Sequence, residues 1–416
     1  MINKFFKKIV DIIKYPWFYF IMELYCFLAP LYKRFIIPRI VKRVRAKDKI
    51  KVLFVIYELG SWKTENLYLM MLNHARFSPK LLLVPNVMAD YAYSIFEKYL
   101  KGKGYEYETM NEGETIQKKL SPDIIFYQKP YVGVTAKEYS FIYNLNSLIC
   151  ELGYCFRNRC IPNKRISPYK SFAWQSYLEN NSVKQDLLRI PSHKGVNYLV
   201  TGIPVMDVLV RNKSFFDNPW RTLPNKRRII FAPHHTVYKS TSPFDYSTFL
   251  QYAEFMLEMA EKYKDKIQWA FKPHPMLQAK LNKIWGVDKT TTYYNRWRDM
   301  ENTQLFEGEY MGLFKYSDAM IHDCGSFKLE YLYTGNPVMY LIKEDQEFDF
   351  PNWQTQEALK LHYHGHNKAE IEAFIINVMN GVDPLKEQRD KFVVDYLLPP
   401  NGKTACENII ESILEN

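Results

Sequence analysis

Two α/β domains, each built on a doubly wound parallel sheet, are the architecture that this sequence predicts. The chain has 416 residues, which exceeds one ordinary hydrophobic core. In both halves, short apolar runs alternate with helix-length segments, a pattern typical of parallel strands covered by helices. In the second half, polar clusters follow the apolar runs, at the sheet edge where such folds bind ligands. The sequence therefore predicts a ligand site in the second domain.

Eight short apolar runs are expected to be the strands of the two sheets. They are residues 51–56, 81–84, 123–127 and 197–200 in the first half and 228–231, 267–271, 319–321 and 338–341 in the second. Helices are expected from about Pro243 to Lys264 and from Ser326 onward. The polar, basic stretch from Arg211 to Arg228 indicates an interdomain linker. We therefore expect domains at 49–220 and 221–416, preceded by an arm at 1–48.

The positive charge of the chain is concentrated in this arm. The net charge is +11, and residues 1–48 carry eleven Lys/Arg against three Asp/Glu, a balance of +8 that leaves +3 for residues 49–416. A cationic surface that wraps nucleic acid would need the excess on a folded domain. We therefore expect no nucleic-acid partner.

The arm has an apolar, aromatic centre, from Tyr15 to Tyr32, with cations on both sides. Pro16, Glu23 and Pro30 interrupt it, which argues against a clean transmembrane helix. An interfacial or re-entrant attachment to the anionic, cytoplasmic face of the cell membrane fits better. The alternative is an extra helix that packs on the domain's own core.

Metal and disulfide frameworks are not expected. The six cysteines include no C-x-x-C pair, and a chain of this length does not need disulfides to fold. His362, His364 and His366 alternate in a glycine-containing segment, where such side chains usually face solvent. We therefore expect no metal site.

Two predicted strand ends carry imidazoles. The first is followed by Ala232-Pro233-His234-His235-Thr236, where histidine can act as a base or as a hydrogen-bond donor to phosphate.

The second predicted strand end is followed by Lys272-Pro273-His274-Pro275. A cation and an imidazole beside a diphosphate would neutralise the charge that gathers on a leaving group. The alternative for His274 is a turn histidine that bonds to the backbone.

A third predicted strand end has the form of a phosphate cradle. Asp323-Cys324-Gly325-Ser326 precedes a helix, so free backbone N–H groups and the helix dipole would receive an anion. Ser326 is alternatively only an N-cap. Glu330 lies one turn beyond Ser326 on the same face, where its carboxylate would accept the hydroxyls of a ribose.

Over about residues 195–345 these motifs together resemble the CDP-glycerol glycerophosphotransferase family, which builds teichoic-acid and capsule-type polymers. The motifs are Thr201-Gly202-Ile203-Pro204, Ala232-Pro233, Lys272-Pro273-His274-Pro275, and the block Ser317-Asp318, Asp323-Cys324-Gly325-Ser326, Glu330-Tyr331 and Pro337. The resemblance implies a GT-B-like α/β fold of two facing Rossmann-like domains, with an N-terminal acceptor domain and a CDP-alditol held mainly by the C-terminal domain. It also implies peripheral membrane attachment through a basic, apolar arm.

The sequence departs from the family at two places. Members carry a Trp-His-Gly-Thr-Pro motif whose histidine is the general base, whereas the comparable corner here runs from Cys150 through Glu151 to Tyr154. Glu151, His234 and His235 are therefore alternative bases. Cys324-Gly325 replaces the family's Tyr-Ser, which keeps a backbone cradle and removes a hydroxyl.

The expected reaction moves glycerol-phosphate, or another alditol-phosphate, from a CDP-linked donor to a hydroxyl of a membrane-anchored glycan or polymer and releases CMP. The expected catalytic residues are His234, His235, His274 and Glu151, and the expected donor-binding residues are Lys272, Asp323, Gly325, Ser326 and Glu330. A dependence on Mg²⁺ stays open. The alternatives are a nucleotide-sugar glycosyltransferase of surface polysaccharide synthesis and a non-catalytic, membrane-bound partner in polymer assembly.

Overall fold

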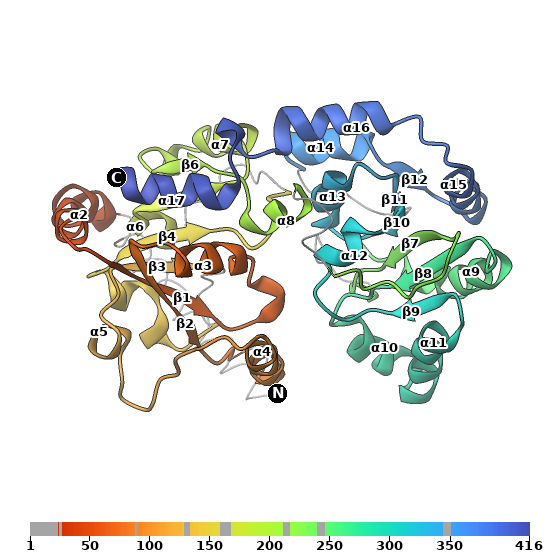
Figure 1. Ribbon diagram of the computed structural model, residues 1–416, viewed down its shortest axis with the longest axis horizontal. Coiled ribbons are helices and arrows are strands. Elements are labelled where there is room, and N and C mark those ends of the chain that lie inside the picture. The colour runs from red at the N-terminus through yellow and green to blue at the C-terminus, as the bar shows by residue number, and fades with distance from the viewer. Residues whose placement is uncertain are drawn as a thin grey trace, which may run out of the picture. The chain divides into compact units, whose positions relative to one another are not determined.

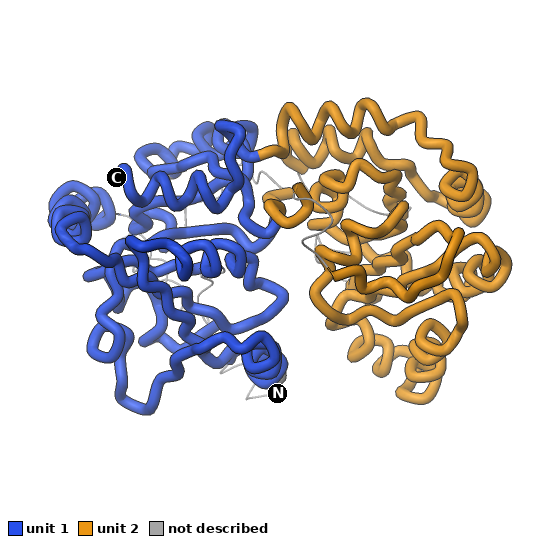
Figure 2. The backbone as a smooth tube through the Cα atoms, in the orientation of Figure 1, with its two compact units in different colours: residues 1–155, 161–205, 399–416 blue, residues 156–160, 206–398 orange. Residues whose placement is uncertain are grey.

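The computed structural model consists of two compact α/β units (Figure 2). Unit 1 comprises residues 1–155, 161–205 and 399–416, and unit 2 comprises residues 156–160 and 206–398. The structure describes residue 24 and residues 27–87, 90–128, 134–158, 168–210, 217–238, 246–343 and 351–416. Each unit contains a six-stranded sheet in which neighbouring strands run parallel. The predicted pair of parallel α/β domains is thus confirmed.

The sheet of unit 1 has the strand order β2-β1-β3-β4-β5-β6. Its strands are β1 (Ile50–Ile56), β2 (Phe77–Leu83), β3 (Ile124–Tyr127), β4 (Leu148–Leu152), β5 (Gln175–Leu178) and β6 (Tyr198–Val200). Its helices are α2 (Ile37–Arg45), α3 (Glu65–Leu72), α4 (Asp90–Lys103), α5 (Ile116–Lys119), α6 (Pro168–Phe172), α7 (Asn181–Leu188) and α17 (Ala405–Glu415) (Figure 1). Along β1, Phe54 packs in the core on one face and Leu53 and Val55 in the core on the other. Since both faces are covered, the strand is apolar at nearly every position.

The sheet of unit 2 has the order β12-β11-β10-β7-β8-β9. Its strands are β7 (Arg227–Ala232), β8 (Ile267–Phe271), β9 (Thr303–Leu305), β10 (Ala319–His322), β11 (Val338–Leu341) and β12 (Tyr363–Gly365). Its helices are α8 (Asp207–Val210), α9 (Phe249–Lys262), α10 (Leu277–Trp285), α11 (Val287–Asp299), α12 (Met311–Lys315), α13 (Phe327–Glu330), α14 (Trp353–Lys360), α15 (Lys368–Asn380) and α16 (Lys386–Phe392). One face of the sheet is covered by α9, α10, α11 and α15, whose apolar residues share a single core with β7 and β8.

Each of the eight predicted strands is present, and the sequence analysis missed β4, β5, β9 and β12. Three of the missed strands, β4, β5 and β9, contain polar residues that the fold nevertheless buries. Gln175 in β5 donates through Nε2 to the carbonyl of Ser412 at 3.1 Å, and Gln304 in β9 donates to the carbonyl of Pro219 at 3.1 Å. Because these partners lie far away in the sequence, the local pattern of apolar residues does not indicate the strands.

The boundary between the units differs from the predicted one near residue 220. The main segment of unit 2 begins at Met206, because the residues after it are bonded to unit 2. Lys315 donates to the carbonyl of Leu209 at 2.6 Å, and the indole of Trp220 donates to the carbonyl of Leu313 at 3.1 Å. The chain also returns to unit 1 at its end, where apolar residues of α17 join the core of the first sheet.

Gly202, in the motif Thr201 to Pro204, contacts the C-terminal segment 399–416. Its φ is +85°, a conformation that side chains other than glycine rarely adopt. A Cβ atom there would also lie 2.9 Å from Cγ of Pro399 and 3.2 Å from Cβ of Ala405. The motif glycine is therefore needed for packing within unit 1.

The arm is described only in part, and its residues 1–23, 25 and 26 lie outside the described residues. Its described end runs through a π-helical turn, Tyr32–Ile36, into α2. Tyr32, Ile40 and Val44 are buried in the core of unit 1, as the alternative of a packed extra helix predicts. Within the described residues, no helix is long and apolar enough to cross a membrane.

Candidate functional site

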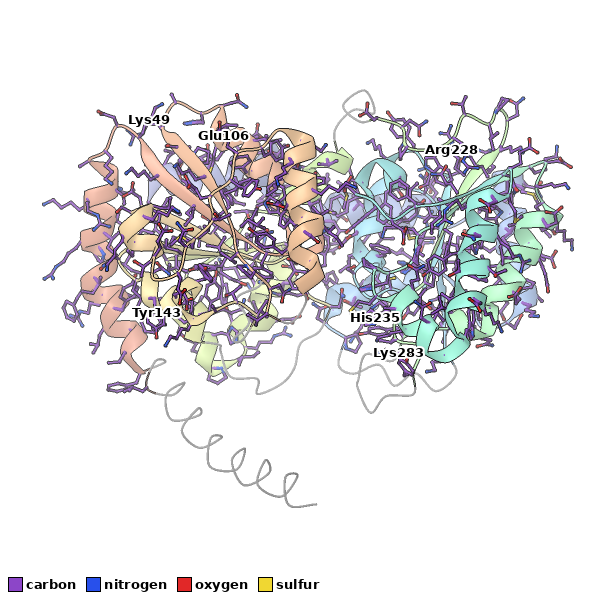
Figure 3. The ribbon with its side chains drawn as sticks, turned by 90° about the horizontal axis from the view of Figure 1, so that it is seen from below. Lys49, Glu106, Tyr143, Arg228, His235 and Lys283 are labelled. Carbon is purple, nitrogen blue, oxygen red and sulfur yellow. The ribbon has the colours of Figure 1, made fainter. Side chains whose placement is uncertain are left out.

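The candidate site lies at the point where the strand order of unit 2 reverses. β7 is the first strand of this sheet in the sequence, and its neighbours are β8 on one side and β10 on the other. In Figure 3, Arg228 at the start of β7 and His235 beyond its end lie on opposite sides of unit 2. The carboxyl edge of the sheet at such a reversal is the usual ligand site of an open α/β sheet.

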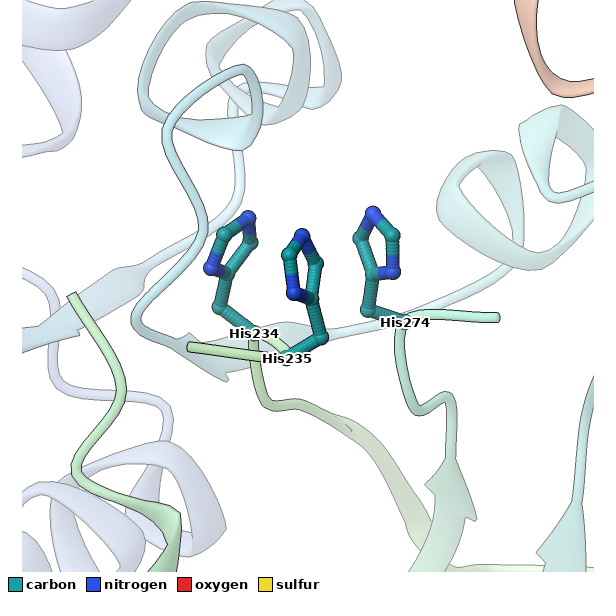
Figure 4. Close-up of side chains that lie close together, drawn as sticks. All are labelled: His234, His235 and His274. Carbon is teal, nitrogen blue, oxygen red and sulfur yellow. The ribbon is translucent and has the colours of Figure 1, made fainter. Parts of the chain in front are cut away.

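Three imidazole rings gather at this edge. His234 and His235 follow β7, and His274 follows β8. Ring centroids lie 4.3 Å apart for His234 and His235, 4.2 Å for His235 and His274, and 5.1 Å for His234 and His274. One ring nitrogen from each histidine lies within 4.8 Å of a ring nitrogen of each of the other two histidines. Figure 4 shows the three rings side by side, pointing the same way from the backbone. The structure thus brings the three predicted histidines together.

The hydrogen-bond partners of two rings fix which ring nitrogen carries the hydrogen. Nδ1 of His274 accepts the backbone N–H of Met276 at 3.1 Å. Nδ1 of His235 lies 2.7 Å from the ammonium of Lys280, which can only donate. In both neutral rings Nδ1 is therefore the acceptor, and Nε2 carries the hydrogen.

The ring of His234 is in the same tautomer, as the contacts of Thr236 indicate. Nδ1 of His234 lies 3.0 Å from Oγ1 of Thr236. That oxygen already accepts the backbone N–H groups of Tyr246 at 3.0 Å and Ser247 at 3.2 Å. Because a hydroxyl has two lone pairs and one hydrogen, Thr236 donates to His234. Nε2 of His234 thus also carries a hydrogen.

The cluster fits an oxyanion better than a metal ion. A histidine that binds a metal through one nitrogen normally donates the other N–H to an acceptor. Here all three Nδ1 atoms face donors, so all three Nε2 atoms present an N–H. Three such groups on neighbouring rings are suited to hydrogen-bond the oxygens of a phosphate.

The rings are neutral at pH 7. Burial is the main cause that lowers their pKa values, to about 3 for His234, about 4 for His235 and about 2 for His274. The charge of Lys280 lowers all three further. The cluster therefore supplies hydrogen-bond donors, and the positive charge of the site comes from its lysines.

Asp323, a predicted donor-binding residue, binds the backbone of the turn that carries His234. Its carboxylate is fully buried and accepts the backbone N–H of His234 through Oδ1. Oδ2 accepts the backbone N–H of Thr248 at 2.7 Å and its hydroxyl at 3.1 Å. Burial raises the pKa of this carboxyl to about 6, against the effect of these bonds. Asp323 thus joins the ends of β7 and β10 to the start of α9.

Lys272 and Glu330 both lie next to Tyr310. Glu330 is buried, and its Oε2 accepts the hydroxyl of Tyr310 at 2.8 Å. The ammonium of Lys272 lies 4.7 Å from the centroid of the Tyr310 ring and 5.3 Å from that of Phe327. Both predicted donor-binding residues therefore belong to this edge of unit 2.

The predicted cradle is a short turn before α13. Ser326 occupies the N-cap position and makes no side-chain capping bond. A Cβ atom on Gly325 would meet Nδ2 of Asn158 at 3.5 Å and Cε2 of Tyr246 at 3.7 Å, which are ordinary contacts. The turn therefore does not need glycine for its own packing.

Glu151, the remaining predicted residue, belongs to unit 1. It lies in β4 and is buried, and its Oε1 accepts the ammonium of Lys170 at 2.9 Å.

The sequence analysis missed four residues around the cluster. They are Thr236 as a partner of His234, Lys280 as a partner of His235, Tyr310 as a partner of Glu330, and Lys328. Lys328 is buried, with its ammonium 4.4 Å from the centroid of the Tyr340 ring. The sequence contained one signal for Lys280, its position on the helix that follows the Lys272 to Pro275 corner. The first turns of a helix that follows a strand lie near the end of that strand.

Comparison with known proteins identifies the segment that carries this site. Residues 181–357 match the family described as CDP-glycerol:poly(glycerophosphate) glycerophosphotransferase. This segment belongs to that family, and the chain is a transferase. The glycerophosphotransferase segment includes each of the predicted site residues except Glu151. None of the curated protein sequences matches the chain.

Solved structures share the fold of this chain. The wall teichoic acid polymerase TagF is 14% identical, with 100% of this chain and 98% of that chain covered and a TM-score of 0.59. MnaA of S. aureus with UDP is 14% identical, with 88% and 96% covered and a TM-score of 0.57. UDP-GlcNAc 2-epimerase of Neisseria meningitidis is 15% identical, with 88% and 100% covered and a TM-score of 0.54. At these identities the likeness concerns the fold, and it agrees with the expected GT-B type.

The histidine cluster predicts how stability depends on pH. Between pH 6.5 and about 4 the unfolded chain takes up protons that the three folded rings do not, so the free energy of unfolding falls as the pH falls. Asp323 acts in the opposite direction, because its raised pKa makes the folded protein the better proton acceptor between about pH 4 and 6. From pH 7 to 5 we expect each histidine to lower the free energy of unfolding by at most about 1 kcal/mol per pH unit, and Asp323 to offset part of this loss. Urea unfolding at several pH values measures the change.

The matched variants for this measurement are His274→Gln and His364→Gln. His274→Gln removes one buried ring and should reduce the pH dependence of the free energy of unfolding. His364 is exposed, so His364→Gln should leave that pH dependence unchanged. An equal slope in wild type and His274→Gln would contradict the assignment.

Proposed function

We propose that the protein transfers glycerol-phosphate from CDP-glycerol to a hydroxyl of a membrane-anchored glycan or polymer in teichoic-acid synthesis and releases CMP. The observation that carries the proposal is the set of three Nε2–H groups at the reversal of the sheet order, within the segment that matches the family. One TagF structure is of a variant soaked with CDPG, which makes a CDP-linked donor the first ligand to test.

In this proposal the cluster binds the diphosphate of the donor. As the bond between the two phosphates breaks, negative charge gathers on the CMP oxygens. Neutral imidazole N–H groups and the nearby cation of Lys272 stabilise that charge without moving, since the fold already holds them in place. Phosphoryl transfer depends chiefly on such positioning and charge stabilisation.

The tautomers also bear on the choice of general base. A base must accept a proton, whereas Nε2 of His234, His235 and His274 already carries one. We therefore assign the three rings to the donor phosphates. Glu151 is then the remaining candidate for the acceptor hydroxyl, as a buried carboxylate that can accept a hydrogen.

The test is isothermal titration of the full-length protein with CDP-glycerol, CDP-ribitol, CMP and UDP-sugars, followed by assay of CMP release with a lipid-linked acceptor. Cytidine-selective binding together with acceptor-dependent release of CMP would support the proposal. Selective binding of UDP-sugars would favour the glycosyltransferase, and the absence of any nucleotide binding by folded protein would refute both enzymes.

Gly325→Ala tests the cradle within this scheme. The added methyl group meets only ordinary contacts in the protein, so the melting temperature should change little. A phosphate that approaches the backbone of the turn would clash with the methyl group, and we expect KM for CDP-glycerol to rise about tenfold with a smaller change in kcat. An unchanged KM would place the phosphates away from this turn.

We also propose attachment to the cytoplasmic face of the membrane through the described end of the arm. Its outer side carries apolar residues at helical spacing, namely Leu24, Phe27, Leu28, Leu31 and Phe35, and all are exposed. Arg34, Arg39 and Lys42 beside them are exposed cations. An apolar stripe with flanking cations suits an anionic lipid surface.

The double substitution Leu31→Glu and Phe35→Glu should lower co-sedimentation with phosphatidylglycerol vesicles about tenfold, because it places two carboxylates on the stripe. Val287→Glu, on an exposed apolar residue of α11, is the control and should bind like wild type. Equal binding of all three proteins would remove the stripe from the attachment surface.

A further inference from the structure

Two buried histidines lie beneath the cradle and take no part in the scheme above. His322 is the last residue of β10, and His362 precedes β12. Both side chains are buried, with ring centroids 5.6 Å apart and ring planes at 67°. His362 belongs to the alternating triplet that the sequence analysis expected to face solvent, and the structure corrects that expectation for this residue, because His362 is 3% exposed.

The two rings are opposite tautomers. Nδ1 of His322 accepts the backbone N–H of Cys324 at 3.1 Å, so its Nε2 carries the hydrogen. Nδ1 of His362 lies 2.7 Å from the carbonyl of Ala358, which can only accept, so this Nδ1 carries the hydrogen and Nε2 is a bare acceptor.

The two remaining nitrogens are therefore a donor and an acceptor. Nε2 of His322 and Nε2 of His362 are both buried, and neither has a hydrogen-bond partner among the residues that the structure describes. An unsatisfied buried polar atom typically costs about 1–3 kcal/mol, and a buried water commonly satisfies such atoms. With the ring centroids 5.6 Å apart, a single water molecule between the two Nε2 atoms would satisfy both of them.

We propose that one buried water accepts the N–H of His322, donates to Nε2 of His362, and so makes the pair a positioning device for the cradle. Burial is the main cause that lowers the pKa of both rings, and the charge of Lys328 lowers both further, so the pair stays neutral. The link fixes the ring of His322, and that ring holds the N–H of Cys324. Gly325, the next residue, then presents its backbone in one orientation. The functional part of this inference rests on the proposed binding of a CDP-linked donor, and the water link does not.

The link itself is tested by NMR of the full-length protein with ¹⁵N-labelled histidine. The expected result is an Nε2–H tautomer for His322, an Nδ1–H tautomer for His362, and a cross-relaxation signal from the His322 Nε2–H to a long-lived water. Assignments come from the single variants His322→Asn and His362→Gln. The opposite tautomer in either ring, or the absence of the water signal, would overturn the link whether or not the protein binds CDP-glycerol.

The positioning role is tested by kinetics. His362→Phe keeps a planar ring and removes the acceptor, and we expect KM for CDP-glycerol to rise about tenfold with kcat within about twofold. His362→Gln, which again offers an acceptor, should recover most of the loss. His364→Phe is the matched control, two residues away and exposed, and should behave as wild type. An unchanged KM in His362→Phe would refute the positioning role and leave the proposed function untouched.

Discussion

Replacement of His274 by asparagine is expected to lower kcat/KM for CDP-glycerol by about 10²–10³, the usual cost of removing one fixed donor from developing negative charge. The amide oxygen of asparagine can take the place of Nδ1 and still accept the N–H of Met276. The turn after β8 should therefore keep its shape, and the melting temperature should change little. The N–H that we propose binds the donor phosphates is lost. Steady-state release of CMP measures the effect.

His274→Gln is the matched variant, because the longer amide brings an N–H to about the place of Nε2. We expect it to recover at least a tenth of the wild-type kcat/KM. Equal loss in both variants would mean that the Nε2–H is not the working group, and wild-type activity of His274→Asn would remove the residue from the donor site.

The sequence predicted which strand ends lie together better than it predicted the chemistry of the residues there. Corners after 228–231, 267–271 and 319–321 were expected to meet, because the ends of parallel strands share one edge of a sheet. The tautomers could not be predicted in the same way. They depend on Lys280, Thr236 and Met276, and only the folded turns bring these groups to Nδ1 of each ring.

The same distinction applies to the carboxylates. Asp323 was expected among the groups that bind the donor, and the structure places its oxygens on the backbone of His234 and on Thr248. The local sequence does not show which task such a carboxylate has, because its burial and its partners are set by the tertiary fold. Polar strands such as β5 and β9 escaped prediction for the same reason.

Asp323→Ala is expected to cause the largest loss of stability among single changes at the site. It leaves the N–H groups of His234 and Thr248 and the hydroxyl of Thr248 without their common acceptor inside the protein. At about 1–3 kcal/mol for each unsatisfied group, we expect the free energy of unfolding to fall by about 3 kcal/mol or more, measured by urea unfolding at pH 7. Donor binding should weaken as well, since the backbone of His234 loses its support.

Asp318 provides the control, because it precedes β10 as Asp323 follows it. Its carboxylate also accepts a backbone N–H, that of Arg228 at 2.8 Å, but it is partly exposed and lies at the opposite end of the strand. Water can replace that acceptor, so Asp318→Ala should cost about 1 kcal/mol and leave the KM for CDP-glycerol unchanged. If both variants lost equal stability and activity, the loss in Asp323→Ala would reflect the removal of any carboxylate at an end of β10, and not a specific role in the site. A loss of donor affinity confined to Asp323→Ala, in protein that is still folded at the assay temperature, would show that this buried carboxylate holds the histidine cluster in place.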